Sequence, residues 1–326
     1  MSDRKKVFDI AGFDPAILDV DQLKALSQAY LEQQTLDDAD WKVDIAYQTQ
    51  NSRILRLEPN DTERFPTLAL KLAPSADIRH EYAVLSSIYD FGFHIGPRPF
   101  YVDEQVLIME WVHGEPLQAP PPPDDEDKWH RMMAVMGVPN SLPFAEYASR
   151  IPMRGTAPHA PADLFHFIDE QLSQIDPNHE TYSELAHLVE RMKDQVAPQW
   201  NTLPPTTLNH FDPRLHHFIW EGYHMRLISW QNADWGDNAY AVGQLCAHPS
   251  YEEMPTSHWV WYRWELARLT KDELLIPRAT TYTNLMLVYW AVRLTYMAAS
   301  TSTPEVAARL TKQRDRYLKR AQRGFV

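Results

Sequence analysis

The sequence predicts an α+β fold in which a small, sheet-based lobe over residues 1–111 precedes a larger helical lobe over residues 112–326. Short β-rich runs separated by polar breaks fill much of the first third of the chain. From Glu126 onward, apolar residues recur at helical spacing almost throughout. Strands that are grouped before helices are typical of α+β proteins, in which helices are segregated from an antiparallel sheet.

The first lobe begins with an expected helix over Leu18–Gln34, where apolar residues recur at i, i+3 and i+4. After it come short apolar runs bounded by polar residues, which predict five strands and one intervening helix. The strands are expected at Val43–Gln48, Arg53–Leu57, Thr67–Leu72, Pro97–Phe100 and Gln105–Trp111, and the helix at Asp77–Tyr89.

The second lobe starts after Pro120–Pro123, which is interpreted as a stiff spacer. Two β-rich runs, Phe218–Trp220 and Met225–Trp230, are joined by Glu221-Gly222 and predict a short hairpin. Apolar periodicity predicts helices at Lys128–Met136, Phe144–Arg150, Ala162–Ser173, Glu180–Val196, Ala239–His248, Thr256–Leu269, Thr280–Ala299 and Pro304–Arg323.

Aromatic residues are dense on two of these helices, and they are interpreted as core packing, with a cage for a cationic ligand as the alternative. They are Trp259, Trp261, Tyr262, Trp264, Tyr282, Tyr289 and Trp290.

Composition bounds the class of protein. A hydrophobic content of 44% and 11 Trp residues predict a globular core, and the net charge of −13 argues against a nucleic-acid or anionic-membrane partner. The single cysteine, Cys246, excludes an intrachain disulfide and is interpreted as buried packing. The most apolar run, Leu285–Val292, is too short to span a membrane, and the N-terminus lacks a secretory signal. A soluble, cytoplasmic protein is expected.

Histidine and carboxylate side chains gather immediately before the predicted hairpin. His210, Asp212, His216 and His217 lie within eight residues of one another. Such a set is poorly explained as core, because ionisable side chains are seldom buried without partners. This stretch is therefore the candidate functional site.

The order of motifs from this stretch onward resembles the catalytic core of the aminoglycoside phosphotransferase and choline kinase family. His210-Phe211-Asp212 matches its His-x-Asp motif, Ile228-Ser229-Trp230-Gln231 its Ile-Asp-Trp-Glu step, and Gly236-Asp237-Asn238 its Gly-Asp-Pro step. The resemblance implies a protein-kinase-like two-lobe fold and ATP-dependent transfer of a phosphoryl group to a small-molecule hydroxyl. It also implies that His210 and Asp212 are catalytic, and that Asp212 orients the acceptor hydroxyl and takes its proton.

The same resemblance implies nucleotide contacts in the first lobe. Lys71 falls at the position of the phosphate-contacting lysine, and Glu81 at that of its ion-pair partner. Leu107–Gly114 resembles the hinge, so main-chain groups at Glu110 and Val112 are expected to bind the adenine edge. ATP and Mg²⁺ are the implied cofactors, and a nucleotide and a small-molecule acceptor are the implied partners.

Three positions depart from the family pattern. The metal-binding Asn is replaced by His217, and the metal-binding Asp by Ser229. Mg²⁺ prefers hard oxygen ligands, and imidazole suits transition metals better. The loop over residues 48–52 contains no glycine, which makes close approach of its backbone to phosphate harder. Asp234 or Asp237 would supply the missing carboxylate only if the loop were rearranged.

Two alternatives remain. The first is a catalytically inactive, kinase-like binding or scaffold protein. The second is a hydrolase or other metal enzyme that uses His210, Asp212, His216 and His217 around Zn²⁺. Adjacent His216 and His217 would point apart on an extended chain, and the spacing of the set matches no zinc motif.

Overall fold

The structure, a computed structural model, describes residues 21, 23–24, 41–49, 51–63, 65–122 and 124–324. The chain divides into two compact units. The first contains the described residues of Met1–Pro116 together with Ser149–Pro152 and Ile219–Asn232. The second contains Leu117–Ala148, Met153–Phe218 and Ala233–Val326. An antiparallel sheet in the first third and helices in the remainder confirm the predicted α+β class.

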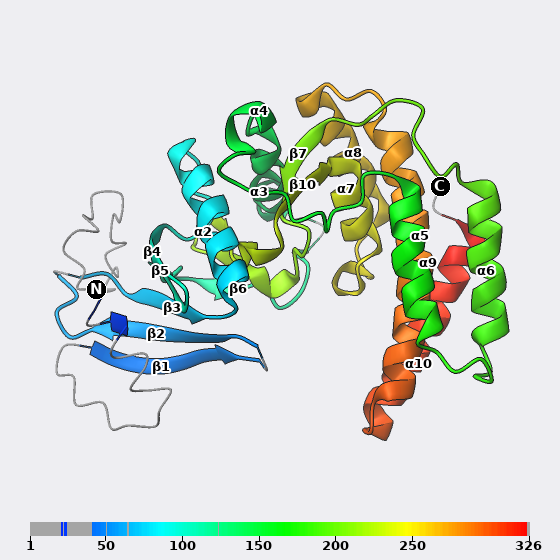
Figure 1. The fold of residues 1–326 in the computed structure, drawn as a ribbon, viewed down its shortest axis with the longest axis horizontal. Coiled ribbons are helices and arrows are strands. Elements are labelled where there is room, and N and C mark those ends of the chain that lie inside the picture. The colour runs from blue at the N-terminus through cyan, green and yellow to red at the C-terminus, as the bar shows by residue number, and fades with distance from the viewer. Residues whose placement is uncertain are drawn as a thin grey trace. The chain divides into compact units, whose positions relative to one another are not determined.

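The first unit is built on a five-stranded antiparallel sheet with the strand order β1-β2-β3-β5-β4 (Figure 1). All five strands coincide with predicted runs, and each end lies within two residues of its predicted position. They are β1 (Trp41–Gln48), β2 (Arg53–Pro59), β3 (Leu68–Leu72), β4 (Pro99–Val102) and β5 (Val106–Glu110). Helix α2 (Ser75–Asp90) follows β3, as expected from the sequence.

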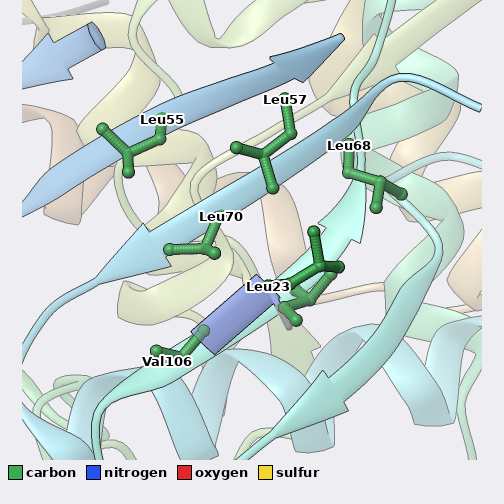
Figure 2. Packing of buried hydrophobic residues seen from close by; sticks show 7 residues of the cluster. Leu23, Leu55, Leu57, Leu68, Leu70 and Val106 are labelled. Atoms are coloured by element: carbon green, nitrogen blue, oxygen red, sulfur yellow. The ribbon is translucent and has the colours of Figure 1, made fainter. Parts of the chain in front are cut away.

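The two faces of this sheet have different tasks. Leu55 pairs with Leu70, and Leu57 with Leu68, so these four leucines share one face. They pack with Leu23, Val106 and Ile108 into a cluster whose members are at most 2% exposed (Figure 2). Lys71, which alternates with Leu70, lies on the opposite face and bonds to a residue of α2.

The helix predicted at Leu18–Gln34 lies mostly outside the described residues, and only residues 21, 23 and 24 of it are described, all of them helical. Leu23 belongs to the leucine cluster on the β2–β3 face, and Figure 2 shows it close to Val106.

The predicted hairpin is present as β8 (Phe218–Trp220) and β9 (Met225–Leu227), with the two-residue strand β6 (Glu115–Pro116) beside β8. The second run was expected to continue to Trp230 but ends at Leu227. Ser229 has a φ of +68°, a left-handed conformation that no strand can contain, and Trp230–Asn232 form a 3₁₀ turn.

The second unit is mainly helical. Its helices follow the predicted segments and are α3 (Glu126–Gly137), α4 (Phe144–Tyr147), α5 (Pro161–Ser173), α6 (Tyr182–Gln195), α7 (Asn238–Ala247), α8 (Thr256–Thr270), α9 (Leu275–Ser300) and α10 (Pro304–Arg323). Helix α4 is shorter than predicted. Helix α9 starts five residues earlier than predicted, because Pro277 lies in its first turn, where a missing N–H breaks no helical hydrogen bond.

Strands β7 (Thr206–Asn209) and β10 (Asp234–Asp237) form an antiparallel pair that the sequence analysis did not predict. Each has only four residues, and β10 contains two aspartates and a glycine, which are depleted in strands. Asp234 pairs with Asn209, so the strands place the segment before His210 beside the segment that leads into α7.

Helices α7 and α9 pack closely (Figure 1). A Cβ atom at Gly243 would lie 2.6 Å from Cβ of Tyr282, so only glycine fits at this contact. Trp259, Tyr262 and Tyr282 are buried, which confirms core packing for them, whereas the side chain of Trp264 is 64% exposed. Cys246 is buried as predicted, and burial raises the pKa of its thiol to about 12. No helix among the described residues has the length and apolar character needed to cross a membrane.

Candidate functional site

Lys71 and Glu81 form a buried ion pair in the first unit. Nζ of Lys71 lies 2.5 Å from Oε2 of Glu81, and the two side chains are 5% and 1% exposed. The pair forms because Lys71 projects from β3 toward α2, on which Glu81 occupies the buried side. A buried charge is stable only when it is paired and hydrogen-bonded, so each residue depends on the other.

Residues of the Ile-Ser-Trp-Gln segment complete this group. Nζ of Lys71 also donates to Oε1 of Gln231 at 2.8 Å, and Oε1 of Glu81 accepts the backbone N–H of Trp230 at 2.9 Å. Trp230 is fully buried, and a Cβ atom at Gly96 would come within 2.9 Å of its Nε1. Among the described residues, these contacts use two of the three N–H donors of the Lys71 ammonium.

Ser229 directly precedes the 3₁₀ turn that carries these contacts, and its backbone is left-handed. The hydroxyl is the oxygen ligand that this position offers, since the carboxylate of the family pattern is absent.

The side chain of Glu110 does not project toward a ligand but forms an ion pair with Arg226. Oε1 and Oε2 accept from Nη1 and Nη2 of Arg226 at 3.1 and 2.8 Å, and Oε2 also accepts the N–H of Arg98. The main-chain N–H of Glu110 donates to the carbonyl of Arg98 at 2.8 Å. The carboxylate and the main-chain N–H of Glu110 are therefore engaged within the first unit.

Val112 differs from Trp111 in its main-chain hydrogen bonding. The N–H of Trp111 donates to the carbonyl of Thr67 at 3.1 Å, whereas the N–H and carbonyl of Val112 have no hydrogen-bond partner among the described residues. The residue is half-buried and lies outside any strand. Of the two predicted hinge positions, Val112 is thus the one whose main-chain N–H is not engaged among the described residues.

The loop that joins β1 to β2 is closed by Thr49. Its Oγ1 accepts the N–H of Asn51 at 3.3 Å and that of Ser52 at 3.0 Å, and its N–H donates to the Ser52 carbonyl at 2.8 Å. The N–H groups of Asn51 and Ser52 are thus engaged by a side chain of the same loop.

Asp212 lies in the second unit in a tight loop after β7. Its N–H donates to the carbonyl of His210 at 2.9 Å, and its carboxylate Oδ1 accepts from Nε of Arg214 at 3.0 Å. His210 is buried at 3% exposure, and Phe211 between them has a φ of +53°. The Asp212 side chain is 20% exposed and can therefore meet a substrate.

Histidines surround this loop. Nδ1 of His217 is bonded to the carbonyl oxygen of Asp212 at 2.8 Å. His217 has ring contacts with His216 and His210 at centroid distances of 4.5 and 5.9 Å. The expectation that His216 and His217 point apart is wrong, because residues 215–217 form a 3₁₀ turn instead of an extended segment.

His248 follows helix α7 and belongs to the same electrostatic environment. Burial lowers its pKa to about 4, and the positive charge of Arg214 acts in the same direction, against the opposing effect of Asp212. Burial and Arg214 likewise lower the pKa of His216. Both histidines are therefore neutral at pH 7.

The carboxylate of Asp234 is fully engaged by backbone and side-chain donors. Oδ1 accepts the N–H groups of Arg154 and Trp235 at 3.0 and 2.9 Å, and Oδ2 accepts both the N–H and the hydroxyl of Thr156 at 3.1 Å. Its exposed fraction is 0%. Asp234 therefore holds a loop in place.

Asp237 caps the N-terminus of α7 and pairs with a buried arginine. Oδ1 accepts the N–H of Ala239 at 2.9 Å, and Arg278 donates to both carboxylate oxygens at 2.9 and 3.0 Å. Arg278 also bonds to Asp272 at 2.7 Å. Like those of Asp234, the carboxylate oxygens of Asp237 are engaged in hydrogen bonds that stabilise the fold.

The side chains that could bind a metal do not form the oxygen-rich set of ligands that Mg²⁺ prefers. The family's two metal positions hold a hydroxyl at Ser229 and an imidazole at His217, and the nearby carboxylates of Asp234 and Asp237 are occupied. In the described ranges, no group of three or more His, Cys, Asp or Glu side chains is arranged to hold a metal ion. That statement includes His210, Asp212, His216 and His217, the residues of the zinc alternative.

Comparison with known proteins decides the family. The sequence profile of the phosphotransferase enzyme family matches residues 46–274, about 70% of the chain. The chain belongs to this family. The match extends beyond the motifs quoted above and confirms the resemblance drawn from them.

Solved structures of phosphotransferases and kinases show the same protein-kinase-like fold. A Ralstonia eutropha JMP134 protein assigned as an aminoglycoside phosphotransferase aligns with a TM-score of 0.64 and 14% identity, over 93% of this chain and 99% of its own. Choline kinase from Cryptosporidium parvum has a TM-score of 0.60 and 12% identity, over 91% and 97%.

A thermostable mutant of aminoglycoside phosphotransferase APH(4)-Ia, in a ternary complex with AMP-PNP and hygromycin B, aligns with a TM-score of 0.59 and 12% identity, over 93% and 100%. A search of curated protein sequences found no significant match.

The described residues thus bring together two groups that the motifs of this phosphotransferase-family chain predicted. Lys71 and Glu81 are in contact in the first unit, and His210, Asp212 and His217 share one loop in the second. Three roles were missed: the bond from Lys71 to Gln231, the closure of the loop by Thr49, and the pairing of Arg214 with Asp212. The proximity of Arg214 to Asp212 in the sequence was the one available signal.

Proposed function

We propose that this protein binds ATP and transfers its γ-phosphoryl group to a hydroxyl of a small molecule, with an altered metal site. The buried pair of Lys71 and Glu81 carries the proposal, since a lysine held at this position would contact the phosphates. Membership of the phosphotransferase family and the AMP-PNP complex of a structural neighbour support ATP as the donor.

In the proposed reaction the acceptor oxygen attacks the γ-phosphorus, and the bond from that phosphorus to the bridging oxygen of ADP breaks. The hydroxyl proton passes to the carboxylate of Asp212, and ADP leaves with the bridging oxygen. Protein groups contribute positioning and charge in phosphoryl transfer, because little covalent help is needed. Lys71 neutralises phosphate charge, and Asp212 orients the acceptor.

The altered metal site follows from the chemistry of Ser229 and His217, neither of which carries a carboxylate. Asp234 and Asp237 are engaged in structural hydrogen bonds, so replacing the missing ligand with either would break part of the fold. We therefore propose that ATP binding depends little on Mg²⁺.

Isothermal titration of the full chain with ATP, once with Mg²⁺ and once with EDTA, tests this function. We expect wild-type binding in both conditions, with affinities within about threefold of each other. Lys71→Met should weaken ATP binding about tenfold or more, since a contact to a charged group is lost. The matched control is Lys42→Met, because Lys42 lies on the same sheet with a side chain that is 66% exposed.

Turnover is measured separately as ADP formation in the presence of hydroxyl-bearing compounds, cationic ones included because the chain is acidic. A second candidate, a catalytically inactive kinase-like binding protein, is favoured by the engagement of Asp234 and Asp237. ATP binding without any ADP formation would support that candidate. Absence of ATP binding in both conditions would contradict the proposed function.

A further inference from the structure

Two side chains of the β8–β9 hairpin hold the main chain on either side of Val112. Arg226 of β9 lies 116 residues after Glu110 and donates from Nη1 and Nη2 to its two carboxylate oxygens at 3.1 and 2.8 Å. The carboxylate of Glu221, in the turn between β8 and β9, accepts the N–H of His113. One hairpin therefore holds the chain two residues before Val112 and one residue after it.

The pair of Arg226 and Glu110 is well fixed. The two side chains are only 12% and 7% exposed. Nη2 of Arg226 also donates to the carbonyl of Gly96, and Oε2 of Glu110 accepts the N–H of Arg98 at 2.9 Å. Because a planar guanidinium that binds a carboxylate through two nitrogens has a defined orientation, this pair holds the end of β5 in one position.

The backbone that follows Val112 packs directly against the same hairpin. Gly114 has a φ of +120°, and a Cβ atom at this position would collide with the carbonyl oxygen of Trp220 in β8. Glu115 then pairs with Trp220 in the ladder between β6 and β8. Only glycine allows this close approach, so the chain after Val112 is held by backbone contacts as well as by Glu221.

Val112 itself keeps one donor and one acceptor for a ligand. Its N–H and its carbonyl have no hydrogen-bond partner in the part of the chain that the structure describes, and the residue is half-buried. Adenine presents the N6 amino group as a donor, whereas guanine presents the acceptor O6 at the same place. A carbonyl that accepts from N6 of adenine would meet a second acceptor in guanine, so main-chain groups in a fixed position distinguish the two bases.

We propose that Arg226 and Glu221 are positioning residues that hold the main chain at Val112 for the adenine base of ATP and so set a preference for ATP over GTP. This inference rests on the proposed function. Hydrogen bonds weaken steeply as the donor angle departs from linearity, so the direction of the Val112 groups decides their strength. A segment that is held at both ends before the base arrives also loses little entropy on binding.

The two contacts depend on one arginine. Nη1 of Arg226 lies 3.8 Å from Oε2 of Glu221, so its charge acts on both carboxylates. Burial raises the pKa of Glu221, and the charge of Glu110 acts in the same direction, against the opposing effects of Arg226 and of the His113 N–H. Arg226 therefore offsets the repulsion between two like charges that lie beside the same segment.

Titrations with ATP and with GTP, both in EDTA, isolate recognition of the base, because the two ligands carry the same triphosphate. We expect the wild-type protein to bind ATP at least about tenfold more tightly than GTP, since an unmatched hydrogen-bonding group costs at least that much. Glu221→Ala should reduce this ratio to below about threefold, while GTP affinity stays within about threefold. Glu221→Gln should keep the wild-type ratio, because an amide oxygen can still accept the N–H of His113.

A second variant tests the arginine. Arg226→Met alone leaves the carboxylate of Glu110 buried without its partner, which destabilises the fold, so it is combined with Glu110→Met. The double variant contains no unpaired buried charge from this pair and should fold, but its ATP-to-GTP ratio should also fall below about threefold. Arg226→Lys keeps the charge without the two-point contact and should give an intermediate ratio.

Arg316→Met combined with Glu252→Met is the matched control. Arg316 of α10 binds the carboxylate of Glu252 through two nitrogens, at 2.5 and 2.8 Å, within the second unit. This variant should keep the wild-type ratio. Thermal unfolding midpoints are measured for every variant, because a purely structural role would lower the midpoint and leave the ratio between two bases unchanged.

An unchanged ATP-to-GTP ratio in Glu221→Ala and in the folded double variant would overturn the inference. Equal binding of ATP and GTP by the wild type would also overturn it, while ATP binding, and with it the proposed function, would stand. If the wild type bound neither nucleotide, the proposed function would fail and the inference with it.

Discussion

The ammonium of Lys71 lies 2.5 Å from Oε2 of Glu81, and neither side chain is more than 5% exposed. This pair joins β3 to α2 through two charged side chains that are buried away from water. Removing one partner of such a pair lowers the free energy of unfolding, because the remaining buried charge is then uncompensated.

We predict that Glu81→Leu lowers the free energy of unfolding by about 3–5 kcal/mol, since it leaves the Lys71 ammonium buried without its carboxylate. The double variant Lys71→Met with Glu81→Leu should be more stable than Glu81→Leu alone, because no unpaired charge remains. Urea unfolding followed by tryptophan fluorescence measures both. A double variant as unstable as the sum of the two single changes would show that the pair is not the source of the cost.

A second prediction concerns Asp212. Asp212→Asn should reduce ADP formation about 100-fold or more, since general base catalysis contributes at least that much. ATP affinity should stay within about threefold, because the new Oδ1 still accepts from Nε of Arg214. A coupled ADP assay and isothermal titration provide the two values. Turnover that survives in this variant would refute the role of Asp212 as proton acceptor.

The metal positions give a third prediction. Ser229→Asp combined with His217→Asn should add Mg²⁺-dependent ATP affinity that the wild type lacks, because carboxylate and amide oxygens are ligands that Mg²⁺ accepts. Titration of the wild type, both single variants and the double variant, each with Mg²⁺ and with EDTA, forms a double-mutant cycle.

The two changes should couple in that cycle, since both ligands would share one ion. Tight Mg²⁺-dependent binding by the unmodified protein would instead show that other residues hold the metal.

A fourth prediction is the pH dependence of stability caused by His248. Its pKa is about 4 in the folded protein against an ordinary value of 6.5, so the folded state favours neutral imidazole. The contribution of neutral His248 to the free energy of unfolding is complete above pH 6.5. It is lost as the pH falls from about 6.5 to about 4, because the unfolded chain binds the proton more tightly. The loss should reach about 3 kcal/mol.

Urea unfolding at a series of pH values tests this dependence. His248→Asn is the control, since an amide oxygen can still accept the N–H of Ser250 but does not titrate. The variant should lose most of the slope between pH 6.5 and 4, and His216 should account for part of what remains, because its pKa is also lowered. Equal slopes in the two proteins would assign the pH dependence to other groups.

Sequence alone could locate the elements because their signals are local. Alternating leucines in Leu68–Leu72 and the apolar stripe of α10 each fix one strand or helix. The pairing of Lys71 with Glu81 could also be expected, since both positions belong to a known motif order. The short strands β7 and β10 could not, because their stability comes from partners that are more than 20 residues apart in sequence.

The hydrogen bonds and ion pairs of candidate side chains were harder to predict than the elements on which the side chains lie. Main-chain groups of Glu110 and the carboxylate of Asp234 were candidates for ligand contacts. The N–H of Glu110 donates to the carbonyl of Arg98, and the carboxylate of Asp234 accepts from Thr156 and its neighbours. Arg98 and Thr156 lie outside helices and strands, so the positions of these partners depend on tertiary packing. A carboxylate read from a sequence is a possible ligand, and only the fold decides whether its oxygens are already used.

The left-handed backbone at Ser229 bears on which residues this position accepts. Asp and Asn are, after glycine, among the residues best tolerated at positive φ, whereas serine has no such preference. The main chain at this position therefore has a conformation that suits an aspartate. Placing a carboxylate there would require no new path of the main chain.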